Sequence, residues 1–83
     1  MTQKQNTTLV KITLANGIIL DPNAEGAKTL TDWAKSKRLK VQAFATSLDT
    51  YLLVKNGQPI FENACLEDCA VHLDIMALDR DLV

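Results

Sequence analysis

The sequence has no long hydrophobic run, and this absence bears first on where the protein works. Its 83 residues contain no stretch that approaches the roughly 18 apolar residues of a membrane-spanning helix. The segment from Met1 to Thr8 is polar, so it also lacks the apolar centre of a secretion signal. We therefore expect a protein of the cytoplasm that has no membrane partner.

The sequence also has few cysteines and a net charge close to zero. The two cysteines, Cys65 and Cys69, are too few for a disulfide framework and fit a reducing compartment. Nine basic residues stand against ten acidic ones, and the formal charge of −1 supplies no broad positive field for a polyanion. A chain of 83 residues has room for one small domain, and 47% hydrophobic residues predict a packed core.

The few reactive side chains form no recognisable catalytic set. Cys65, Cys69 and His72 are of the types that bind zinc, and Asp74 or water would supply a fourth ligand. They are weak metal candidates, because structural zinc sites usually draw their ligands from two separate knuckles and small cysteines often fill a core. His72 is the only histidine that could activate a cysteine, and no oxyanion donor accompanies it. We expect no enzymatic activity, no catalytic residues, no cofactor and no metal.

The first half of the chain predicts a hairpin followed by a helix. Alternating apolar residues over 9–14 indicate a strand, Asn16-Gly17 indicates a tight reversal, and the return strand over 18–20 ends before Pro22. A helix is predicted from about Thr29 to Arg38, and a start near Ala24 is the alternative. Its register places Trp33 in the core.

The second half predicts another hairpin and ends in an ambiguous segment. A strand over 51–54, the Asn56-Gly57 reversal and a short or edge strand near Pro59 form the hairpin. The spacing of apolar residues over 66–77 satisfies a helix, which would give the order β-β-α-β-β-α, but the alternation over 71–77 also satisfies a strand. We favour the strand. It would place His72 and Asp74 outward and the alternating apolar residues inward, namely Val71, Leu73, Ile75 and Ala77.

Five segments matter by their order along the chain: the hairpin over 10–17, and residues 26–34, 54–58, 66–68 and 71–75. In this order they resemble the ubiquitin-like β-grasp superfamily, and above all the TGS domains of threonyl-tRNA synthetases and the small sulfur carriers. The resemblance implies an α+β domain over 9–79, with a mixed four- to five-stranded sheet packed on one main helix, a flexible segment over 1–8 and a short tail over 80–83. The tail lacks the two terminal glycines that sulfur carriers activate.

The functional expectation is a noncatalytic binding or adaptor module that acts through contacts with another protein. The alternatives are a sulfur-carrier-like component of cofactor biosynthesis and a TGS-like RNA-binding module. Two sets of residues are candidates for the contact surface. One is the outward sheet face, with Lys11, Thr13, His72 and Asp74, and the other is a basic cluster for an acidic partner or RNA, with Lys35, Lys37, Arg38 and Lys40. The sequence does not indicate whether the protein is a monomer or an oligomer.

Overall fold

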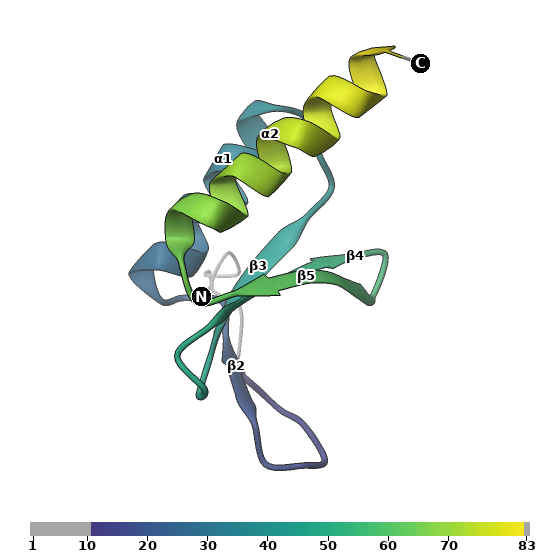
Figure 1. The fold of residues 1–83 in the computed structure, drawn as a ribbon. Helices are drawn as coiled ribbons and strands as arrows, with labels where there is room; N and C mark the ends of the chain where they lie inside the picture. The colour runs from purple at the N-terminus through teal and green to yellow at the C-terminus, as the bar shows by residue number, and fades with distance from the viewer. Residues whose placement is uncertain (1–10, 83) are drawn as a thin grey trace, which may run out of the picture.

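The strands of this α+β protein form one open, antiparallel sheet. The computed structural model describes residues 11–82, so the segment 1–8, expected to be flexible, lies outside the described residues. In chain order the elements are β1 (Ile12–Thr13), β2 (Ile19–Asp21), α1 (Glu25–Ser36), β3 (Gln42–Thr46), β4 (Tyr51–Lys55), β5 (Gln58–Asn63) and α2 (Leu66–Leu82). Each strand pairs with its neighbour in the order β1-β2-β3-β4-β5, and both helices lie on one side of the sheet (Figure 1).

The predicted closing strand over 71–77 is wrong, because these residues belong to α2. The helical register buries Cys69, Leu73 and Ala77, which are spaced four residues apart, whereas a strand would have to bury Val71 and Ile75. The expected mixed sheet is therefore also wrong, since all four strand pairings are antiparallel. The small α+β architecture is confirmed, and the order β-β-α-β-β-β-α has one strand more than the helical alternative allowed.

Both predicted hairpins are present, and their Asn-Gly pairs work in different ways. Asn56 and Gly57 both have positive φ, at 53° and 76°, which is the two-residue type I′ turn that matches strand twist. In the first hairpin only Gly17 has positive φ, at 90°, and its amide donates to the carbonyl of Leu14. That hairpin therefore has a three-residue loop closed by glycine.

Helix α1 begins at the earlier of the two predicted starts and is tied to the sheet by a buried threonine. Thr29, expected as its cap, lies inside the helix and donates to the carbonyl of Glu25 at 3.0 Å. Thr31 is buried, and its hydroxyl oxygen accepts a hydrogen bond from the amide of Ala43 in β3 at 3.0 Å. This contact satisfies a buried hydroxyl and fixes α1 against the middle of the sheet.

The carboxyl end of α1 stops at a residue in the left-handed conformation. The amide of Leu39 donates to the carbonyl of Ala34, and the amide of Arg38 donates to the carbonyl of Lys35, both at 2.9 Å. Arg38 has φ 59°, in the place where such helix ends usually carry glycine. The chain then turns back towards β3 through buried Leu39 and Val41.

The core lies between the sheet and the two helices. Small residues of α1 let that helix approach the strands closely, and α2 adds one leucine and one cysteine that are fully buried. Ten residues form this cluster: Ala27, Leu30, Ala34, Leu39, Val41, Ala43, Leu53, Cys69, Leu73 and Ala77. Trp33 is not among them and is 42% exposed, so its predicted place in the core is wrong. No helix in the range 11–82 is long and apolar enough to cross a membrane.

Candidate functional site

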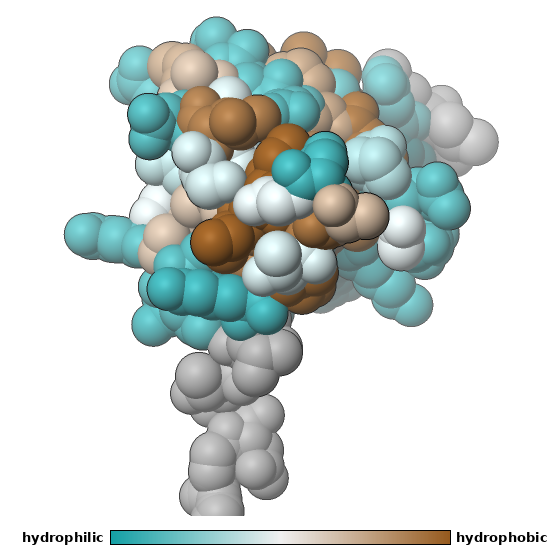
Figure 2. All heavy atoms as spheres, turned by 90° about the horizontal axis from the view of Figure 1, so that it is seen from below, coloured by the Kyte–Doolittle hydropathy of each residue, from teal (hydrophilic) through white to brown (hydrophobic). Residues whose placement is uncertain are grey.

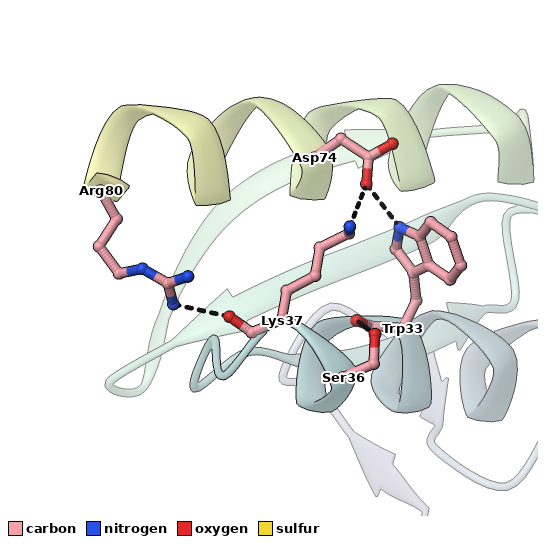
Figure 3. Close-up of polar contacts among 5 residues, drawn as sticks. All are labelled: Trp33, Ser36, Lys37, Asp74 and Arg80. Atoms are coloured by element: carbon pink, nitrogen blue, oxygen red, sulfur yellow. Dashed lines mark hydrogen bonds and ion pairs between the residues drawn. The ribbon is translucent and has the colours of Figure 1, made fainter. Parts of the chain in front are cut away.

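A polar seam between α1 and α2 fixes how the second helix is presented to solvent. Asp74 of α2 accepts a hydrogen bond from the indole Nε1 of Trp33 at 2.9 Å, and the same oxygen lies 3.0 Å from Nζ of Lys37 (Figure 3). The lysine also lies over the tryptophan ring, 4.7 Å from its centroid. The hydrogen bond from Lys37 is the largest cause that lowers the pKa of Asp74 below its ordinary value of 3.8, and the bond from Trp33 adds to it.

Arg80 holds the far end of the seam. Its guanidinium donates to the carbonyl of Lys37 at 2.6 Å and to that of Arg38 at 3.2 Å, so a cation of α2 satisfies the free carbonyls at the end of α1. Arg80 and Asp81, expected in a short tail, continue α2. The two helices are therefore joined by side chains at both Asp74 and Arg80, and the outer face of α2 has a defined orientation.

That outer face carries a row of exposed aliphatic residues, which we call the α2 stripe. Val71, Ile75 and Leu78 are 52%, 50% and 60% exposed. Their spacing of four and three residues places them on one face of the helix, because residues three and four apart are neighbours on a helix surface. Burial of these side chains requires something other than the described part of the chain.

A depression of about 310 Å³ adjoins the stripe, between α2 and β5. Val71 and Ile75 of the stripe line it together with Phe61 and His72. The rings of Phe61 and His72 are stacked, with centroids 4.2 Å apart and planes 6° from parallel. Since β5 is the last strand of the described sheet, this depression opens at the sheet edge and continues the stripe with an aromatic wall.

The structure does not bring the four predicted sheet-face residues together. Lys11 and Thr13 are exposed on the amino-terminal hairpin, whereas His72 and Asp74 lie on α2. His72 is engaged with Phe61, and Asp74 is engaged in the seam. The expected face was built on a strand register that the chain does not adopt.

The predicted basic cluster is also divided between different surroundings. Lys37 pairs with Asp74, and Arg38 occupies the helix end. Lys35 and Lys40 line a separate depression of about 420 Å³ beside α1, which Leu39, Val41 and the Asn56-Gly57 turn also line. Two of the four cations therefore share one open surface.

The cysteines and histidine that were weak metal candidates do not form a common ligand set. Cys65 is exposed, while Cys69 is buried with its Sγ 3.8 Å from the carbonyl of Asn63. Burial raises the pKa of the Cys69 thiol, and the nearby Cys65 and Asp68 raise it further. Among the residues the structure describes, no group of three histidine, cysteine or acidic side chains is arranged to hold a metal ion.

A second apolar surface lies at the amino-terminal hairpin. Figure 2 views the molecule from the hairpin end and shows hydrophobic side chains gathered in the middle of that face. Ile12, Leu14 and Ile19 are each 38–43% exposed. This hairpin follows directly from residues 1–10, which lie outside the described range, whereas the surroundings of the α2 stripe are made of described residues.

Comparisons with models of protein families, with curated proteins and with solved structures found no match to this chain. The candidate site therefore depends on the geometry of α2 and β5. The helical alternative for 66–77 already left Val71, Ile75 and Leu78 on the side opposite its buried face, but these residues were not among the predicted contact residues. The segment 66–78 carries apolar residues on both sides of a helix, more than one buried face requires.

Proposed function

We propose that this protein is a noncatalytic binding module and that the α2 stripe, with the depression beside β5, is its contact surface for another protein. The observation that carries the proposal is the row formed by Val71, Ile75 and Leu78, each at least half exposed. Contiguous apolar surface of this kind is typical of interaction sites, whereas single exposed aliphatic residues are ordinary.

Burial of the α2 stripe by a partner would give a contact of moderate strength. Complete burial of one Val, Leu or Ile side chain contributes about 1.5–3 kcal/mol, so burying the exposed halves of three contributes about 3 kcal/mol. The depression beside Phe61 and His72 offers a place for a further side chain of the partner. An anchor in a pocket, next to an apolar row and surrounded by polar residues, is how binding energy is usually concentrated at an interface.

The seam between the helices is what makes this surface suitable for recognition. Trp33, Lys37 and Arg80 fix α2 against α1, so the stripe does not have to be ordered when a partner arrives. A preorganised surface loses less conformational entropy on binding than a mobile one. This support comes from the seam itself and does not depend on the β-grasp resemblance, from which the carrier and RNA-binding alternatives were drawn.

Site-specific photo-crosslinking in cells of the source organism tests the proposal. A photoreactive aromatic amino acid replaces Ile75 in one variant and Leu48 in a matched control, where Leu48 is 59% exposed in the β3–β4 loop. We expect a discrete protein adduct from position 75 and none from position 48. The adduct from position 75 should disappear when Val71→Lys and Leu78→Lys are added. Absence of any adduct at position 75, or adducts at both positions that survive the lysines, would refute the proposal.

A further inference from the structure

We infer that the partner segment is an amphipathic helix whose apolar face is flanked by lysine or arginine, an inference that rests on the proposed function. The α2 stripe spans two helical turns, from Val71 to Leu78, which is about 10 Å along the axis. A row of this length and spacing is what one helix offers to the ridges of another. The adjoining depression takes one larger side chain from the same face of the partner.

The charge around the stripe sets the partner's chemistry. Helix α2 carries five carboxylates, from Glu67, Asp68, Asp74, Asp79 and Asp81, against the single cation Arg80. Arg80 donates to backbone carbonyls of α1 and lies 3.3 Å from Asp81, so it faces the seam and an acidic neighbour. The stripe is therefore an apolar row in an acidic setting.

Two exposed carboxylates lie directly beside the row. Asp68 is three residues before Val71, and Asp79 is four residues after Ile75, so each occupies a position next to the stripe on the helix surface. Asp68 also lines the depression with Val71 and Ile75. Lysine or arginine on the flanks of a docked helix would meet these carboxylates, and the long stems of such residues would cover the edges of the row.

The same charges argue against a second copy of this chain as the occupant. If two copies packed with their α2 helices antiparallel and centred on the stripe, Asp68 of one copy would lie near the Asp79–Asp81 end of the other. If the two helices were parallel, each carboxylate would face the same carboxylate of the second copy. Both arrangements place like charges together, which is unfavourable. Anionic lipid and RNA are disfavoured by the same acidic surroundings.

Three synthetic helical peptides test the inference against the whole protein. The first has leucines at positions i, i+4 and i+7 with lysine flanks, the second has the same leucines with glutamate flanks, and the third has the composition of the first with the leucines dispersed. Binding is measured by titration calorimetry, and Trp33, the single tryptophan, gives an independent fluorescence readout next to Asp74. We expect the lysine-flanked peptide to bind at least tenfold more tightly than either of the others in dilute salt. Near 1 M salt, the difference in affinity between the lysine-flanked and glutamate-flanked peptides should become smaller.

Matched variants separate the two contributions. Asp68→Asn combined with Asp79→Asn should lower the affinity for the lysine-flanked peptide by about threefold for each carboxylate removed, since exposed charge pairs are individually weak. The control Asp49→Asn, in the β3–β4 loop, should leave affinity unchanged. Ile75→Ser should weaken the peptide by about tenfold, through lost apolar contact.

The possible outcomes distinguish the inference from the proposed function. Equal or tighter binding of the glutamate-flanked peptide, or no effect of the aspartate substitutions, would overturn the basic partner and leave the binding surface intact. Equal binding of the dispersed peptide would overturn docking along the stripe. A dimer in sedimentation equilibrium that Ile75→Ser dissociates would assign the stripe to a second copy. The proposed function fails on its own separate test, when no crosslink forms from position 75 or when crosslinks from positions 75 and 48 both survive the lysine substitutions.

Discussion

Leu73 and Ile75 are two residues apart, but their replacement by alanine should destabilise the protein to very different extents, because α2 buries Leu73 and exposes Ile75. Leu73 is 0% exposed and belongs to the core, whereas Ile75 is 50% exposed on the α2 stripe. Leu73→Ala removes three carbon groups at about 0.8 kcal/mol each, which gives about 2.4 kcal/mol before any cavity is counted. With the cavity the expected loss in the free energy of unfolding is about 3–5 kcal/mol.

Ile75→Ala should be much milder. About half of its side chain is already in solvent, and alanine has the better helix propensity, so we expect a loss of about 1 kcal/mol or less. Because a domain of this size has a total stability of about 4–12 kcal/mol, Leu73→Ala should remove between about a quarter and all of it.

Thermal unfolding followed by far-ultraviolet circular dichroism measures the difference. A loss of 1 kcal/mol lowers Tm by about 4–8 °C in a domain of this size, so Leu73→Ala should lower Tm by at least about 12 °C and Ile75→Ala by about 8 °C or less. The two residues would be equally sensitive if 71–77 were an extended strand, since both would then face the core. Similar losses for the two variants would therefore refute the placement of α2.

Three further predictions concern the helix end, the seam and the thiols. Arg38→Gly should raise the free energy of unfolding by about 1 kcal/mol, measured as a higher Tm, because the φ of 59° at this position favours glycine. Arg38→Ala keeps the same backbone penalty and should not raise Tm. A higher Tm for both variants would contradict this explanation. The hydrogen bond from Lys37 is the main reason that the pKa of Asp74 is lower in the folded protein than its ordinary value of 3.8. Ionised Asp74 therefore stabilises the folded protein at pH values above 3.8, and this contribution is lost as the pH falls through the lower folded pKa. Trp33 fluorescence should report this acid transition, and Asp74→Asn should abolish it. Iodoacetamide should modify only the exposed Cys65 in the native protein, and both Cys65 and the buried Cys69 after unfolding in urea. Intact mass counts the adducts, and rapid modification of both thiols in the native protein would show that Cys69 is not buried.

The hairpins could be predicted from the sequence because their signals are local. Asn56-Gly57 specifies its turn through the conformations that these two residues tolerate, whatever the rest of the chain does. The edge position of Pro59 followed from its missing amide hydrogen, and β5 is the last described strand of the sheet. Features that depend on one or two residues were therefore predictable.

Trp33 could not be placed in this way because its surroundings come from a distant segment. Its helical position lies beside Leu30 and Ala34, so the register alone indicates the core. In the structure the buried face of α1 is filled by small residues and Leu30, and the indole lies at the border with α2, where Asp74 accepts its hydrogen. A residue 41 positions away decided the outcome.

The error over 71–77 and the proposed binding surface have one origin, which is that α2 is apolar on two sides. One side, with Leu73 and Ala77, fills the core, and the other carries exposed Val71 and Ile75. Taken together, these four residues alternate along the sequence in the way that predicted a strand. A helix needs only one apolar face to pack on a sheet, so the second must be buried by other means or remain in water. The seam at Asp74 keeps that second face turned outward. The carboxylates beside that face are the reason we propose a cationic partner rather than another copy of the chain. The pattern that made the segment ambiguous as a sequence is therefore the same property on which we base the proposed binding surface.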